Sequence, residues 1–393
     1  MIGVRCEIKG NQGEPGMASK VYILGAGSSI GHSHKLFPAI TTFFSCAKEF
    51  DLYSSKDFNN FKDLQLYVKD MMGFDIYVST RKIDIEAVMT LIDIELERTA
   101  SPRLLTIRQQ LLELIQRVLI AAEEEITSRK GKGEYNLLTS GLQKKDTIIT
   151  FNWDLLLDNV LNRIPILKSY QTKRNVSEKY QSGQYYRFIL DLSAIGEKSW
   201  QGAFVRNPYY DWNPPGGYYL KVHGSIDRHY CSNESCRFFR KVFPVLLNEV
   251  YYCSECHEPL EHLLIPPVLN KGYHQYPLIR RIWNLAAKEI SSAEELIIWG
   301  YSMPPTDFHS AYLLRQCRKN PPKRLVIINP SVKTKKNTVA TVFVRRFYEM
   351  FRGKIEKEKE SLSLFENFSD YHSSVDILDK YHIGPAKKAY SGI

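Results

Sequence analysis

Runs of apolar residues alternate with helical patterns along the chain, and this alternation predicts the fold. Short β-branched runs that end in glycine or a small polar residue are typical of buried strands. Five such runs occur: KVYILGAGSS (20–29), DTIITFN (146–152), YYLKVHGS (218–225), EELIIWGYS (294–302) and RLVIINPS (324–331). Because helical patterns separate strands of this kind, we expect an α/β fold with a doubly wound, parallel, Rossmann-like sheet.

A long helical stretch separates the first two predicted strands. Between about 51 and 140, apolar residues recur with the spacing of one helix face, most clearly in 83–98 and 104–126. Pro102 lies between these two segments and marks a break. We therefore expect a helical insertion whose apolar faces form core rather than a groove for a partner. A further helix is expected around 307–319.

The N-terminal segment, 1–18, is expected to be a flexible leader. It contains glycine and lacks the apolar middle region of a signal peptide, and Met17 is an alternative start to Met1. No apolar run approaches the roughly 18 residues that a membrane span needs. We expect a cytoplasmic protein, in which cysteines stay reduced unless they hold metal.

The C-terminal segment, 332–393, is polar and basic, and we expect a helical or mobile tail there. The EKEKE run at 356–360 is typical of a solvated helix face. The formal net charge of the whole chain is +10, which suits either nucleic-acid phosphates or an anionic small molecule. No stretch of basic residues interleaved with aromatics matches a nucleic-acid module, so direct nucleic-acid binding is not expected.

Polar residues follow the predicted strands at the rim where ligands bind in open parallel sheets. The turn Gly25-Ala26-Gly27-Ser28-Ser29 suits the approach of backbone N–H groups to a pyrophosphate. Its spacing, GxGxxxG, differs from the GxGxxG fingerprint of dehydrogenases, which disfavours an ordinary dehydrogenase.

Three further side chains at this rim are candidates for catalysis. Asn152 and Asp154 follow the second strand, and His223 follows the third. A histidine in this place suits a general base, although it could instead be held by a backbone carbonyl. Asp154 could also cap a helix that starts at Leu155.

Two cysteine pairs, Cys231-x4-Cys236 and Cys253-x2-Cys256, predict a zinc-ribbon module over about 228–262. Thiolates are the ligands that Zn²⁺ prefers in closed structural sites. His257 and His262 are alternative ligands if one cysteine is not used. The remaining cysteines are isolated and are expected to serve packing: Cys6, Cys46 and Cys317.

The order of these motifs resembles that of the sirtuins, and most closely the divergent sirtuin-like proteins of bacterial and archaeal antiviral defence. The resemblance covers about 20–331, within a predicted domain of 19–331. It implies an NAD+-binding Rossmann domain with structural Zn²⁺. Asn152 and Asp154 would contact the nicotinamide side and its ribose, and His223 would be the base. The remaining NAD+ contacts implied by the resemblance are Gly25, Ala26, Gly27, Ser28, Ser29, Gly300, Tyr301, Ser302 and Asn329.

The chain departs from lysine-deacylating sirtuins on the peptide side. Phe151 stands where they have Gln before the Asn, GHSHKLFPAI (31–40) does not match their acidic-Phe-Arg stretch, and IPPVLNKGYHQYP (265–277) replaces their Phe-Gly-Glu segment. The NAD+ half is retained, so the pattern favours NAD+ hydrolysis over protein deacylation. The resemblance also implies a repressed antiviral effector, a homo-oligomer and a HerA-type ring ATPase as partner. The alternatives are an NAD-dependent deacylase and a catalytically silent NAD+ or ADP-ribose sensor.

Overall fold

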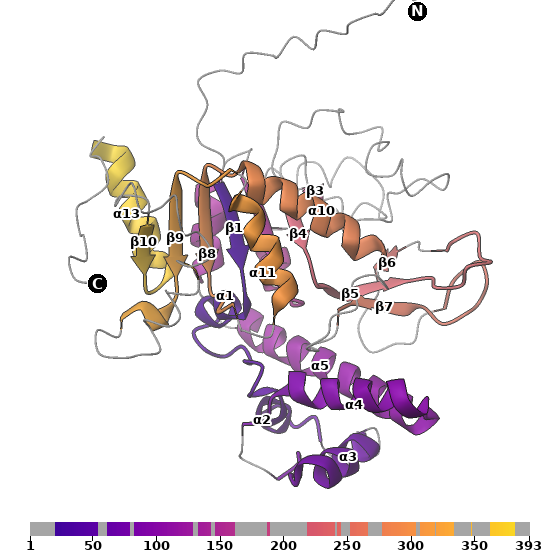
Figure 1. Cartoon of the computed structure of the whole chain (residues 1–393). Coiled ribbons are helices and arrows are strands. Elements are labelled where there is room, and N and C mark those ends of the chain that lie inside the picture. Colours follow the sequence, from indigo (N-terminus) through magenta and orange to yellow (C-terminus); the bar gives the residue numbers. More distant parts are fainter. Residues whose placement is uncertain are drawn as a thin grey trace, which may run out of the picture.

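Seven parallel strands form the central sheet of the computed structural model, in the order β10-β9-β8-β1-β2-β4-β3 (Figure 1). The strands are β1 (Lys20–Leu24), β2 (Thr147–Thr150), β3 (Arg187–Phe188), β4 (Tyr218–Lys221), β8 (Glu295–Trp299), β9 (Arg324–Ile328) and β10 (Leu362–Phe365). The structure describes residues 20–53, 61–78, 82–128, 133–142, 146–161, 187–188, 218–239, 242–244, 252–265, 277–303, 307–318, 320–333, 347 and 362–381. All five predicted strands are present.

Helices cover both faces of the sheet, which confirms the doubly wound fold class. Alternate strand residues point to opposite faces, so Tyr22 and Leu24 pack into one core and Val21 and Ile23 into another. The first face is covered by α2 (Phe43–Glu49), α7 (Leu156–Leu161), α13 (Phe368–Tyr381) and the insertion. The second face is covered by α10 (Pro277–Ser292), α11 (Phe308–Leu314) and the 3-10 helix η5 (Arg315–Arg318).

Within the predicted insertion, the described residues form the helices α3 (Lys62–Met72), α4 (Ile85–Thr99), α5 (Pro102–Ser128) and α6 (Glu134–Gly141). Pro102 is the first residue of α5 rather than only a break, a position where its missing N–H costs nothing. Buried residues of all four helices belong to the same core as the first sheet face. Their apolar faces are therefore core, as expected.

Part of the expected C-terminal tail belongs to the sheet. Strand β10 pairs in parallel with β9, and Phe368 and Tyr371 of α13 are buried against the sheet. The segment Leu-Ser-Leu-Phe at 362–365 is too short to stand out from sequence beside a charged run. That run, 356–360, lies outside the described residues, as does the leader 1–18.

A small antiparallel sheet, β6-β5-β7, lies beside the parallel one (Figure 1). Its strands are β5 (Gly224–Tyr230), β6 (Val242–Pro244) and β7 (Glu261–Leu264). The run 218–225, expected as one strand, is thus divided between β4 and β5. Gly224 has a φ of 80° and a Cβ there would collide with the Leu263 carbonyl, so only glycine fits this junction.

Among the described residues, no helix combines the length and the apolar character needed to cross a bilayer.

Candidate functional site

The turns after β1 and β8 are packed against each other. The Gly27 amide donates to the Gly300 carbonyl at 2.9 Å, and the Gly25 amide donates to the Trp299 carbonyl at 3.1 Å. Gly300 has a φ of 67°, and a Cβ there would collide with the Ser28 amide. The glycines are therefore needed for the close approach of two backbone segments, whether or not a pyrophosphate also binds there. Of the predicted turn, only Gly25 precedes helix α1 (Ala26–His32), as its N-cap, and the rest forms the start of that helix, where Ala26 is exposed.

A buried group of hydroxyls joins the first two strand ends. The Tyr135 hydroxyl lies 2.9 Å from both the Ser28 and the Ser29 hydroxyl, and both serines are fully buried. The Asn152 amide donates to the Ser29 hydroxyl at 3.0 Å and to the Gly25 carbonyl at 3.1 Å. Four of the predicted site residues thus meet in one hydrogen-bonded network. Tyr135, from helix α6, was not predicted, because nothing in its sequence neighbourhood links it to the strand ends.

Asp154 is buried and uses both carboxylate oxygens within the chain. The Ser29 hydroxyl donates to Oδ2 at 2.7 Å, and the Leu156 amide donates to Oδ1 at 3.1 Å. The second bond is of the capping kind predicted from sequence, but α7 starts at Leu156, one residue later than predicted. Burial raises the pKa of the Asp154 carboxyl, and the nearby Lys221 opposes that rise. Asp154 therefore fixes its neighbours.

Glu123 of α5 brings a second buried carboxyl to this region. Its Oε1 accepts from the Leu155 amide at 2.6 Å, so the insertion is bonded directly to the segment that follows β2. Burial, followed by the charge of Asp154, raises the pKa of Glu123 well above its ordinary value. The helical pattern of 104–126 gave no sign of this contact.

Lys221, at the end of β4, is a further buried residue that sequence reasoning missed. Its Nζ donates to the Asp154 carbonyl at 2.6 Å and to the Asp158 carboxylate at 3.1 Å. Its side chain is 1% exposed. A lysine inside the otherwise apolar run YYLKV was the available signal, because buried lysines need partners.

His223 lies in an aromatic group. Its ring centroid is 5.0 Å from that of Phe151 and 6.3 Å from that of Trp283. Phe151 in turn stacks on Tyr301 at 4.6 Å. The Phe that departs from the sirtuin Gln is thus buried between the base candidate and the turn after β8.

Asn152 and His223 leave neighbouring strands at the same level. Thr150 and Lys221 are register partners, and each candidate follows its strand partner by two positions. The Val222 amide still donates to the Thr150 carbonyl at 3.0 Å, which continues the pairing beyond the strands. Neighbouring strands run about 4.8 Å apart, so the two backbone segments are adjacent.

The remaining predicted NAD+ contacts occupy different environments. The Tyr301 hydroxyl donates to the Asp307 carboxylate at 3.1 Å, whereas Ser302 is exposed. Asn329 starts the turn into the 3-10 helix η6 (Pro330–Lys333), and its backbone N–H donates to the Phe365 carbonyl at 2.9 Å. The Asn329 backbone is therefore joined to the edge strand β10.

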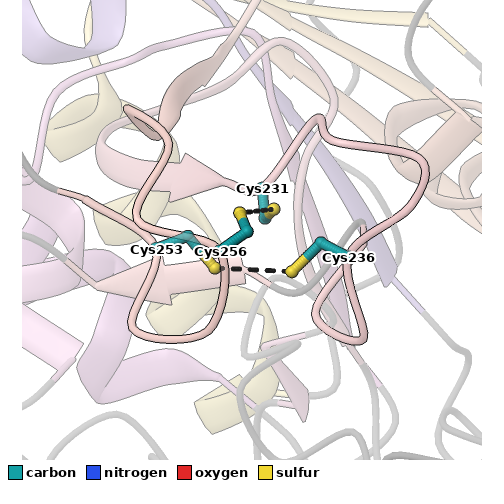
Figure 2. A group of neighbouring side chains, drawn as sticks. All are labelled: Cys231, Cys236, Cys253 and Cys256. Atoms are coloured by element: carbon teal, nitrogen blue, oxygen red, sulfur yellow. Dashed lines mark hydrogen bonds between the residues drawn. The ribbon is translucent and has the colours of Figure 1, made fainter.

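The four predicted cysteines come together at the end of the small sheet (Figure 2). Their sulfur atoms all lie within 4.8 Å of one another. The Cys231 and Cys256 sulfurs are 3.7 Å apart, as are those of Cys236 and Cys253. Tetrahedral zinc with Zn–S bonds of about 2.3 Å requires sulfur separations of about 3.8 Å. The cluster is therefore consistent with zinc.

The alternative histidine ligands lie outside this cluster. Among the described residues, the four cysteines are the only group of three or more His, Cys, Asp or Glu side chains that could hold a metal ion. The His262 Nδ1 lies 3.0 Å from the Gln116 amide nitrogen instead. Cys317 is buried and Cys46 is half-buried, in keeping with packing roles, whereas Cys6 lies outside the described residues.

No protein-family model matches the chain, and no curated protein matches it. Among solved structures, a Sir2 homologue in complex with NAD shares 13% identity at a TM-score of 0.35, over 92% of this chain and 90% of that chain. Sir2 in complex with an inhibitor, 2'-O-acetyl-ADP-ribose and a deacetylated p53 peptide shares 12% identity at 0.32, over 93% and 95%.

Proposed function

We propose that the protein hydrolyses NAD+ at the bond between nicotinamide and ribose, releasing nicotinamide and ADP-ribose. The observation that carries this proposal is the convergence of β1, β2, β4 and β8 at one rim. There an amide, Asn152, is held by two buried serines, and an imidazole, His223, leaves the neighbouring strand at the same level. Ligands of open parallel sheets bind at this rim, where the chain order of the strands reverses beside β1.

The reaction needs little general-acid catalysis from the protein. Cleavage of a glycosidic bond passes through an oxocarbenium-like transition state, and the positively charged nicotinamide leaves as a neutral base. Asn152 would position the ribose or the attacking water, and His223 would accept a proton from that water or from a ribose hydroxyl. Asp154, with both oxygens bonded internally, would act by fixing Ser29 and the start of α7.

The remaining contacts with NAD+ follow from the resemblance described above. The segment 25–29 would receive the pyrophosphate at the exposed Ala26, while the backbone amides of Gly25, Gly27 and Ser28 donate to carbonyls of the chain. The exposed Ser302 would touch phosphate or ribose, and Asn329 would hold the adenosine ribose. The full set implied by the resemblance is Gly25, Ala26, Gly27, Ser28, Ser29, Asn152, Asp154, Gly300, Tyr301, Ser302 and Asn329, within which Asp154 would act through Ser29.

The cysteine cluster would hold one structural Zn²⁺. Its four thiols complete a tetrahedral set, which leaves no ligand position for substrate, and the sulfur separations of 3.7 Å suit zinc. The ion would supply folding energy to the small sheet and its loops. No chemical step is assigned to it.

A catalytically silent NAD+ or ADP-ribose binder is the second candidate, and a specific observation favours it. The amides of Gly25, Gly27 and Ser28 already donate to carbonyls of the chain, and the Asn152 amide donates to Gly25 and Ser29. Such a site could bind without turnover. An NAD-dependent deacylase would share the NAD+ contacts. It would be identified if an acyl-lysine peptide accelerated NAD+ consumption, with one NAD+ consumed for each peptide deacylated.

Paired variants test the catalytic assignments. Asn152→Ala and His223→Ala should each lower the rate of nicotinamide release by about 10²–10⁴-fold, the usual cost of losing a positioned base or polar group. Circular dichroism of each variant should match the parent, which separates catalysis from folding. Rates near the parent value in both variants would remove these assignments.

The same proposal includes regulation, because unrestrained NAD+ cleavage would poison the cell that makes the protein. We propose a repressed effector of antiviral defence that acts as a homo-oligomer or beside a HerA-type ring ATPase. The helical insertion, whose helices α3 and α4 extend away from the strands (Figure 1), and the basic tail after 331 are the surfaces that we propose for these contacts. Light scattering after size exclusion, with and without the neighbouring gene product, should show an assembly. A monomer in both cases would contradict it.

A further inference from the structure

The Lys221 side chain makes hydrogen bonds that are not needed for the pairing of strand β4. An ammonium presents three donors and no acceptor, and three oxygens lie within reach of Nζ. These are the Asp154 carbonyl at 2.6 Å, the Asp158 carboxylate at 3.1 Å and the Trp153 carbonyl at 3.4 Å. Two of the three belong to the segment that carries Asn152 and Asp154.

Stability alone does not account for a lysine here. Replacing a buried ion pair by apolar residues of similar volume is often neutral or stabilising, and the neighbouring residues of β4 are apolar. Tyr219, two positions earlier on the same strand face, also donates to the Asp158 carboxylate, at 3.0 Å. Asp158, which lies in α7, would thus keep a hydrogen-bond donor if Lys221 were replaced. The bonds to the two carbonyls need another explanation.

Those bonds connect the two strand ends that carry the proposed catalytic side chains. Lys221 precedes His223 by two positions in the chain, and its Nζ holds the backbone just after Asn152. The Trp153 carbonyl also accepts from the Ile226 amide, at 3.2 Å, just beyond His223. The end of β2 is therefore tied to the chain on both sides of His223.

We propose that Lys221 is a positioning residue for NAD+ cleavage, which sets the placement of Asn152 relative to His223 by tying the end of β2 to β4. This inference rests on the proposed function for its catalytic consequence. Its structural part, that Lys221 fixes the 151–157 segment, can be tested without any turnover.

The matched comparison uses Asp158→Asn alone against Lys221→Met with Asp158→Asn. The single variant removes the ion pair but keeps both carbonyl acceptors of Lys221. The double variant also removes the donors, and it removes both charges of the Lys221–Asp158 pair together, which limits the cost to folding. The difference between the two variants reports the bonds to the carbonyls together with the lysine charge that acts on the Asp154 carboxyl.

We expect Asp158→Asn to stay within about 3-fold of the parent kcat, and the double variant to lose about 10²-fold more with little change in KM, since a misplacement of about 1 Å can cost that much. Amide hydrogen exchange in 151–157 should be at least about 10-fold faster in the double variant, with exchange in α5 and β8 unchanged. A purely structural role would lower the melting temperature without this local pattern.

Two results would overturn the inference. Equal exchange in 151–157 in both variants would show that Lys221 does not fix the segment, whether or not the parent cleaves NAD+. Faster exchange with equal kcat in an active parent would show that the fixing is irrelevant to the reaction. A parent that never cleaves NAD+ defeats the proposed function, and the exchange comparison then still decides whether Lys221 holds the segment.

Discussion

The cysteine module and the strand-end network both bring polar side chains together, but by different physical means. In the module, four thiols from two short sequence pairs converge within 4.8 Å. In the network, Ser29, Tyr135 and Asp154 come from three separate elements and are held by hydrogen bonds between buried groups. The first arrangement can be predicted from the local spacing of the cysteines, whereas the second depends on how the sheet and the insertion pack.

The largest expected effect comes from breaking the module. Cys253→Ser removes a buried thiol from the set of four, and we expect bound zinc to fall from about one ion per chain to none, because a structural site needs all its ligands. Metal analysis of the purified protein measures this. Cys46→Ser is the matched control, since that half-buried cysteine lies outside the cluster and its loss should leave zinc unchanged. Full zinc in Cys253→Ser would contradict the assignment.

A smaller effect is expected from breaking the network at its centre. Tyr135→Phe keeps the ring and removes the hydroxyl that lies between Ser28 and Ser29. Leaving buried polar groups with fewer partners should lower the free energy of unfolding by about 1–2 kcal/mol. Urea denaturation measures the change, and Tyr312→Phe, at an exposed tyrosine of α11, should change it by less than about 0.5 kcal/mol. Equal effects of the two variants would show that the network is not holding the site.

The smallest expected effect is a pH dependence at the edge of the network. Burial raises the pKa of Glu123, so the folded state keeps a proton that the unfolded chain releases above about pH 4.3. This carboxyl therefore contributes most at low pH, and its contribution is lost as pH rises toward the folded pKa. Glu123→Gln keeps the acceptor for the Leu155 amide and cannot ionise. Denaturation at pH 5 and pH 8 should show the parent losing stability relative to the variant at the higher pH. A stability difference between the parent and Glu123→Gln that is the same at both pH values would contradict the raised pKa of Glu123.

The difference between the two regions also explains what sequence could predict. The strand ends, the four cysteines and the cap at Asp154 follow from local patterns, and the structure brings the cysteines together as expected. Tyr135 gave no local signal, and Lys221 was marked only by its place in an apolar run. The partners of both residues are distant in the chain and depend on the packing of α6 and β4. Strand β10 was missed since four residues beside a charged run give no clear periodicity.

The most direct test of the central claim is incubation of the parent protein with NAD+, alone and with the neighbouring gene product, followed by chromatographic identification of products. The proposal predicts equal amounts of nicotinamide and ADP-ribose, or its cyclised form, in at least one of the two conditions. NAD+ that binds tightly and is recovered intact in both conditions would contradict hydrolysis and identify a silent binding site instead.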